Sequence, residues 1–77
     1  MNKPRRKELE TVQEKLTEMK EMISDILADE QDYFDNIPEN LQNSERAENS
    51  QIAIDSLENI DSLIEEIDNY INDAINC

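Results

Sequence analysis

Apolar residues recur at alternating three- and four-residue spacings in two long segments of this chain, one on each side of Pro38. This spacing places the apolar side chains along one face of an α-helix and is typical of coiled-coil a and d positions, whereas the alternation expected of β-strands is absent. The pattern therefore predicts an all-α protein built from two long amphipathic helices. The first series is Leu9, Val12, Leu16, Met19, Ile23, Ile26 and Tyr33, with Glu30 at one heptad position; the second is Ala53, Leu57, Ile60, Ile64, Ile67, Ile71 and Ala74.

The segment between the two series carries the signals of a turn. Pro38 disfavours helical backbone at Ile37, so the first helix should end near Asn36. Asn43 or Ser44 can cap the second helix. We predict one hairpin domain over residues 1–77, with a loose basic tail at 1–4, helices at about 5–36 and 44–76, and a turn at about 37–43. Helices of matched length joined by a short connection pack antiparallel.

More apolar residues are present than one contact between two helices needs. Phe34, Ile37 and Leu41 are expected to fill the turn. The second helix also carries apolar residues on both sides of its predicted seam, and this stripe is wider than a two-stranded contact requires. We therefore expect either a homodimeric four-helix bundle or another protein to cover the spare strip. The flanking residues of the second helix are Ile54, Leu63, Tyr70 and Ile75.

The charge of the chain is strongly negative and unevenly distributed. The net charge is −13; residues 1–20 carry six Lys and Arg against four Glu, whereas residues 21–77 carry sixteen acids against Arg46 alone. Direct binding of DNA or RNA by the main body is disfavoured, because phosphate contacts need Lys and Arg. A protein partner with a basic surface, including one that normally holds nucleic acid, is favoured by the same field. The alternative is that the charge serves only solubility.

Residues that could support catalysis or bind a metal are few. The chain has no His, so it has no Ser–His or Cys–His pair. Carboxylate pairs need a dry pocket to separate their pKa values, and a hairpin offers none. The glycine of an EF-hand loop and the Glu-x-x-His of helical di-metal sites are also absent. We expect no enzyme activity, no cofactor and no metal site, and we interpret Glu65, Glu66 and Asp68 as a solvated face.

The cysteine content and the length of the apolar runs indicate the cellular compartment in which the protein is expected. Cys77 is the only cysteine, so no intrachain disulfide can form, which fits a reducing compartment. No apolar run approaches the ~20 residues that span a bilayer, and no signal-peptide segment is present. We expect a cytoplasmic protein that does not contact a membrane.

A row of carboxylates on the second helix is the main candidate for a partner-binding site. Its members recur at three- and four-residue spacings and so share one helix face. Carboxylates one turn apart lie ~5–6 Å from each other, which resembles the separation of successive phosphates, and like charges at this spacing do not favour helix formation. The alternative is a solvated coiled-coil face. The members of this row are Asp55, Glu58, Asp61, Glu65 and Asp68.

A second candidate contact lies near the turn. Tyr33 stands between Asp32 and Asp35, and aromatic residues are frequent in binding hot spots. The alternative interpretation places Tyr33 in an aromatic cluster that closes the hairpin.

Residues 29–46, with the sequence DEQDYFDNIPENLQNSER, resemble the turn of small helical-hairpin proteins of bacteriophages and mobile elements of Gram-positive bacteria. The second helix is similar to those proteins in its repeats AIDSLE (53–58) and IDSLIE (60–65). The resemblance covers most of residues 8–75 and departs in the Asn-rich second helix and the basic tail. It implies a phage context, and with it a small inhibitor of a host defence protein, of the anti-CRISPR or anti-restriction type.

Two functions follow as hypotheses. The first is a non-catalytic phage-type inhibitor that binds a basic surface of a host nuclease or other nucleic-acid-binding protein, in the manner of a nucleic-acid mimic; charge reversal at Asp61 and Glu65 should then abolish binding. The second is a structural or adaptor coiled coil that homodimerises or joins a helical bundle. Under the second hypothesis, Lys in place of Ile64 and Ile71 should abolish assembly.

Overall fold

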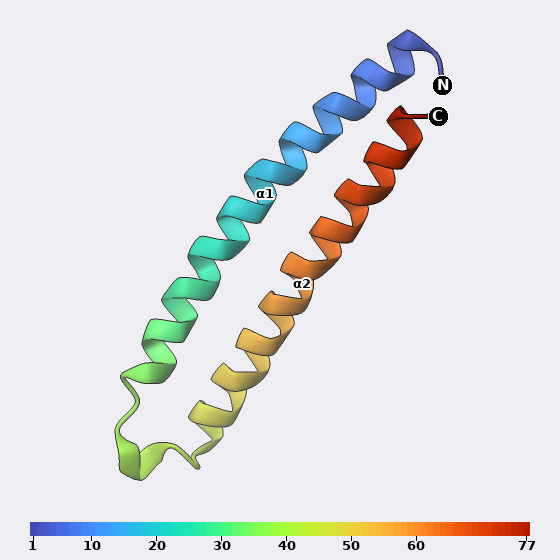
Figure 1. Cartoon of the computed structure of the whole chain (residues 1–77). Helices are drawn as coiled ribbons and strands as arrows, with labels where there is room; N and C mark the ends of the chain where they lie inside the picture. The colour runs from blue at the N-terminus through green and yellow to red at the C-terminus, as the bar shows by residue number, and fades with distance from the viewer.

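Two long α-helices and a short turn make up the computed structural model, which describes residues 1–77. Helix α1 spans Lys3–Asp35, a 3-10 turn (η1) spans Glu39–Leu41, and α2 spans Glu45–Ile75. The helices run antiparallel side by side, with both termini at one end of the molecule (Figure 1). The result is a rod with extents of 59 × 15 × 12 Å. The predicted all-α antiparallel hairpin is confirmed.

Helix α1 begins two residues earlier than the sequence pattern predicts, because its first turn is capped. The side chain of Asn2 accepts a hydrogen bond from the backbone N–H of Arg5 at 3.0 Å. Pro4 lies in this first turn, where its missing N–H would have no intrahelical partner in any case. The prediction of a loose tail over residues 1–4 is therefore wrong for Lys3 and Pro4, which are helical.

The turn follows the local signals closely. Helix α1 ends one residue before Asn36, whose N–H donates to the carbonyl of Asp32 at 3.1 Å. Of the two candidate caps, Ser44 is used: its Oγ accepts a hydrogen bond from the Ala47 N–H at 3.3 Å.

The apolar residues of the turn are not equally covered. Ile37 is buried and Phe34 is half-buried, whereas Leu41 is 41% exposed. Gln42 Nε2 donates to the carbonyl of Ile37 at 2.9 Å and holds the turn against the end of α1. The prediction that Leu41 fills the turn is wrong, since Leu41 is among the exposed large apolar side chains of the molecule.

The contact between the helices is rotated relative to the predicted seam. On α1, the half-buried residues other than Gln31 form one line, in which a predicted seam position is followed by the residue four places further on. These residues are Leu9, Gln13, Leu16, Lys20, Ile23, Leu27, Glu30 and Phe34. On α2, the buried and half-buried residues are chiefly Ala47, Ser50, Ile54, Leu57, Asp61, Ile64, Asp68 and Ile71. The remaining predicted seam residues are exposed, namely Val12, Met19, Ile26 and Tyr33 on α1 and Ile60 and Ile67 on α2. On each helix, therefore, only one of the two predicted rows of seam residues lies in the contact. The other row is exposed, and the prediction is wrong for it.

The buried core of the hairpin is small. Only six of the 77 residues are buried, and no large side chain is completely covered. A short chain buries a small share of its surface on folding, so a narrow line of contacts and a few polar pairs hold the two rods together. The six are Ile37, Ala47, Ser50, Ile54, Ile64 and Ile71.

Candidate functional site

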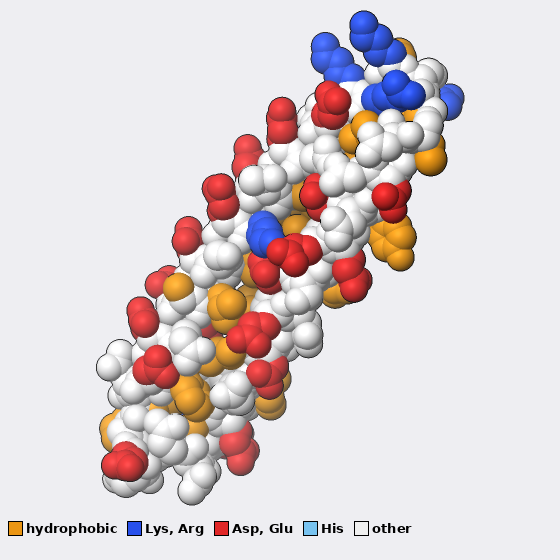
Figure 2. All heavy atoms as spheres, viewed as in Figure 1, with side chains coloured by type: hydrophobic (Ala, Val, Ile, Leu, Met, Phe, Trp, Pro, Cys, Tyr) orange, Lys and Arg blue, Asp and Glu red, His pale blue; other side chains and the backbone are white.

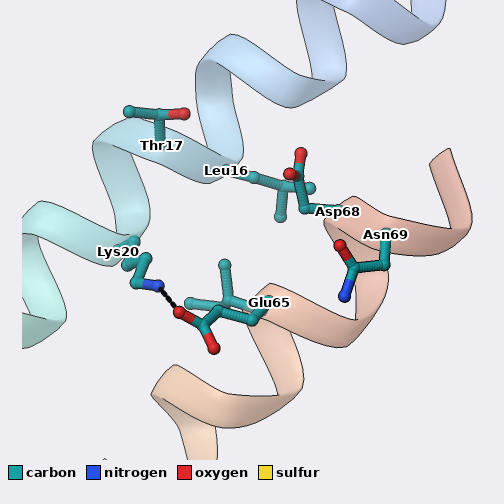
Figure 3. A pocket seen from close by; sticks show the side chains of 7 residues that line it. Leu16, Thr17, Lys20, Glu65, Asp68 and Asn69 are labelled. Carbon is teal, nitrogen blue, oxygen red and sulfur yellow. Dashed lines mark hydrogen bonds and ion pairs between the residues drawn. The ribbon is translucent and has the colours of Figure 1, made fainter. Parts of the chain in front are cut away.

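Lys20 lies at the centre of the contact between the helices, beside the predicted acidic row of α2 (Figure 3). Its Nζ donates a hydrogen bond to Glu65 Oε1 at 2.5 Å and lies 4.0 Å from Asp61 Oδ1. The hydrogen bond from Lys20, together with its charge, holds the pKa of Glu65 below the ordinary value of 4.5. The same hydrogen bond raises the pKa of Lys20 above 10.5. Asp61 Oδ1 is buried and accepts no hydrogen bond, so its charge is offset only by the ammonium nearby.

Gln13 makes a second polar link one heptad before Lys20. Its Nε2 donates to Asn72 Oδ1 at 2.7 Å and to Asp68 Oδ1 at 3.2 Å. Asp68 is half-buried by this arrangement. Three members of the predicted α2 row therefore face α1 and are engaged by it, and do not project freely from the molecule.

An open hollow of about 400 Å³ lies beside these contacts, between the two helices (Figure 3). Leu16 and Ile64 contribute its apolar lining, and the ion pair of Lys20 and Glu65 forms part of its polar lining. No three carboxylate or thiol groups of the chain lie close enough together to hold a metal ion. The chemistry of this hollow is that of an ion pair between helices, and its charged groups already have partners.

The other predicted contact residues lie on outer surfaces. Asp55 and Glu58 are exposed on α2, and Asp55 accepts a hydrogen bond from Gln51 at 2.9 Å. Asp32 and Asp35 are exposed at the end of α1, and Tyr33 between them is 45% exposed. The structure brings Asp61, Glu65 and Asp68 together around Lys20 and Gln13, and it does not join all eight predicted residues into one surface.

The outer side of α1 carries a longer acidic row than the one predicted on α2. Six carboxylates recur there at three- and four-residue spacings, with a single gap at Ala28, and all are exposed. None of them forms an ion pair, and Figure 2 shows red side chains in a line along the edge of the molecule that α1 forms. Lys15 and Lys20 lie between these acids in the sequence, and only the helical arrangement separates the acids from them. The α1 acidic row consists of Glu14, Glu18, Glu21, Asp25, Asp32 and Asp35.

Positive charge is concentrated at the end of the rod where the termini lie (Figure 2). The basic residues there are Lys3, Arg5, Arg6 and Lys7. The opposite end, around the turn, is acidic on balance, because Arg46 is outnumbered there by Asp32, Asp35, Glu39, Glu45 and Glu48. The hairpin is therefore electrically polarised along its length.

The exposed apolar residues form a face of their own. On α1, Val12, Met19, Ile26 and Tyr33 repeat every seven residues along one side of the seam, and the polar Gln13 and Lys20 occupy the other side. On α2, Ile60 and Ile67 repeat along one side, and Asp61 and Asp68 occupy the side that meets Lys20 and Gln13. The apolar sides of the two helices therefore lie together, opposite the polar links. We define the apolar face as Val12, Met19, Met22, Ile26 and Tyr33 of α1 with Ile60, Leu63, Ile67 and Tyr70 of α2.

Fold and charge together define the molecule as an acidic two-helix hairpin of coiled-coil type. Comparison with known protein families, with curated proteins and with solved structures finds no match to the chain. The resemblance to hairpin proteins of phages and mobile elements therefore stays a prediction. Neither helix combines the length and the apolar character that crossing a bilayer requires.

Proposed function

We propose that this chain is a non-catalytic inhibitor of the phage type, which places an acidic helical face on the basic surface of a host nucleic-acid-handling protein and thereby blocks access of nucleic acid. The observation that supports the proposal is the α1 acidic row: six exposed carboxylates with no cationic partner. From Glu14 to Asp35 the row is about 30 Å long, at ~1.5 Å per residue.

The row has the properties expected of a surface that a basic cleft attracts. Neighbouring carboxylates one helical turn apart present negative charge at ~5–6 Å intervals. Like-charged groups arranged this way accelerate encounter with a basic surface and are screened by salt. Tyr33, exposed between Asp32 and Asp35, offers an aromatic contact at the end of the row.

The α2 acidic row has a divided role in this proposal. Asp55 and Glu58 are free to contact a partner, whereas Asp61, Glu65 and Asp68 hold the helices together. Charge reversal at Asp61 and Glu65 would therefore break the link to Lys20 as well as change the surface. A cleaner test acts on Glu18 and Asp25 of the α1 acidic row, whose exposed carboxylates form no ion pair within the molecule.

The test compares two double variants that differ only in which helix carries the new charges. Glu18→Lys with Asp25→Lys reverses two exposed carboxylates seven residues apart on α1. Glu66→Lys with Asp73→Lys makes the same change, at the same spacing, on the exposed outer side of α2. Because both pairs change the net charge equally, a difference between the variants reports the position of the charges and not the total.

Binding is measured in two steps. Proteins captured from a bacterial host lysate by the wild-type chain are identified, and the association of one purified candidate is then measured at several salt concentrations, with and without its own nucleic acid. We expect affinity to fall as salt rises, nucleic acid to compete, and the α1 variant to lose at least tenfold more affinity than the α2 variant, since close charge pairs at interfaces couple by ~1.5 kcal/mol or more. Equal affinities for the two variants, or no competition by nucleic acid, would contradict the proposal.

A structural or adaptor role is the second candidate, and the exposed apolar face favours it. Under this alternative the apolar face assembles with other helices, and the acidic rows only keep the protein in solution. Ile64 and Ile71 are buried between α1 and α2, so replacing them with Lys would disrupt the hairpin itself. Substitutions at exposed positions such as Ile67 report assembly without this complication.

A further inference from the structure

We propose that the apolar face binds a second copy of this chain, with the two rods antiparallel, to form a four-helix bundle. The inference uses a different surface from the acidic rows, with Tyr33 the one residue named for both, and it does not depend on the proposed function. Four observations carry it: the absence of carboxylates on the α2 part of the face, the dimensions of the rod, the small core of the single hairpin, and the opposite charges of its two ends.

The α2 side of the apolar face contains no carboxylate. The positions that form and border it are Asn49, Ala53, Ser56, Ile60, Leu63, Ile67, Tyr70 and Ala74, and its single charged residue is Arg46, one heptad before Ala53 at the turn end. The carboxylates of this helix all lie elsewhere: Glu45, Glu48, Asp55, Glu58, Asp61, Glu65, Glu66, Asp68 and Asp73. A solvated helix face has no physical reason to lack carboxylates in so acidic a chain, whereas an interface core is depleted of charged residues.

The α1 side of the face is almost as free of charge. Arg5 lies at its end, and Glu8, Lys15 and Asp29 border it at heptad positions. The three border residues carry both signs, in contrast to the outer side of the same helix, which carries only negative charge from Glu14 to Asp35. Two copies of a molecule with a net charge of −13 can therefore meet through this face with little direct repulsion.

The side of the rod that carries the face is long enough for a standard interface. The rod measures 59 × 15 Å across its two helices, so a second rod laid along it has room to bury the ~800 Å² that each partner contributes to a standard interface. Tyr70 is 75% exposed and Met22 is 64% exposed in the single hairpin. Because only six residues are buried within one copy, a second copy would supply the central core that small helical domains otherwise lack.

The polarised ends of the rod select the antiparallel arrangement. A twofold axis perpendicular to the rods brings the basic end of one copy, which carries Arg5 and Arg6, beside the acidic turn of the other. A twofold axis along the rods would place basic end against basic end and acidic turn against acidic turn. Charge complementarity fixes orientation in this way in helical assemblies. The α1 acidic rows remain on the outside of the dimer.

Sedimentation velocity of the full chain over a range of concentrations tests whether the apolar face forms the dimer. We expect the wild type to sediment as a dimer and Ile67→Glu to raise the dimer Kd about tenfold or more, because it buries an unpaired charge. The matched control is Ile52→Glu: Ile52 is also on α2 and is 64% exposed, but it lies outside the apolar face. A monomeric wild type, or equal effects of the two substitutions, would overturn the proposal.

Two further measurements on the wild type keep the test decisive if Ile67→Glu fails to fold. The midpoint of thermal unfolding should rise with protein concentration, as it does for a dimer and not for a monomer; a constant midpoint would contradict association. A spin label on Cys77, the single exposed cysteine, reports orientation through double electron–electron resonance. Antiparallel copies should give a distance close to the 59 Å length of the rod, whereas labels within about two helix diameters (~20–24 Å) would overturn the antiparallel arrangement.

Discussion

Polar residues placed in the seam between the helices decide how the helices are paired. Ser50 is buried, and its Oγ donates to Glu30 Oε1 at 2.7 Å, which explains why a carboxylate is tolerated at a heptad position of α1. Lys20 and Gln13 make the corresponding links to α2 nearer the termini. Each of these links forms only when the two helices are rotated about their axes so that the polar residues face each other. The links therefore specify the register of the helices, as single polar residues do in coiled coils.

The ion pair of Lys20 and Glu65 should make a pH-dependent contribution to stability. Since Lys20 lowers the pKa of Glu65 in the folded state, the contribution is fully present above the ordinary pKa of 4.5 and is lost as pH falls through the lowered folded value. Its high-pH limit follows from the raised pKa of Lys20: the contribution is complete below 10.5 and is lost as pH rises through that raised value. Glu65→Gln should therefore lower the thermal midpoint at pH 7, and the difference from wild type should shrink below pH 4.5.

Glu66→Gln is the matched control for this prediction, since Glu66 is the neighbouring exposed acid and has no partner. Its loss removes a like charge and should leave the midpoint at pH 7 unchanged or raised. Calorimetry of the two variants and the wild type between pH 3 and pH 8 provides the comparison. If the two variants follow the same pH profile, the ion pair does not contribute in solution.

The helices themselves begin and end for local reasons. Asn2 caps α1 and Ser44 caps α2, each with its side chain accepting a backbone N–H three residues further on. Pro38 stands where α1 has ended and η1 begins. These signals act over one turn of the chain, and so they place the ends of the elements without reference to the other helix.

The cap of α2 provides a prediction about this element. Ser44→Ala should lower the free energy of unfolding by about 1 kcal/mol, because it removes the acceptor for an N–H in the first turn of the helix. Asn43→Ala is the control, since Asn43 is exposed and is not the cap residue; it should change the free energy by less than about 0.5 kcal/mol. Urea unfolding followed by circular dichroism measures both, and a larger loss for Asn43→Ala would show that the cap is misassigned.

The whole molecule depends on a thin line of apolar contacts. Ile54 is 3% exposed and Ile64 is 5% exposed, whereas most other large apolar side chains are half-covered or free. A rod with so little interior loses a large part of its stability when one buried residue is truncated.

Truncation at two nearby isoleucines of α2 tests this arrangement. Ile54→Ala should cost about 2–3 kcal/mol, toward the lower end of the range for buried isoleucine, since the rod can partly close the space. Ile52→Ala, only two residues away but 64% exposed, should cost less than about 0.5 kcal/mol. Similar losses in thermal or urea unfolding would place the seam elsewhere on α2.

The sequence alone determined the helices, the turn and the hairpin. The three–four spacing of apolar residues, the proline and the cap residues all act between neighbours in the chain, so the predicted helix ends agree with the structure within about two residues. The sequence also marked the acidic row of α2 and the surplus of apolar residues. These features depend only on helical periodicity.

Only the tertiary structure decided which side of each apolar stripe became the seam. The stripes are wider than one contact, so Met19 and Lys20, or Ile60 and Asp61, were competing choices that periodicity cannot separate. The choice rests on links such as that from Lys20 to Glu65, between residues 45 positions apart, and no local pattern encodes such a pairing. That same choice determines which carboxylates are engaged between the helices, which remain free for a partner, and which apolar side chains stay uncovered.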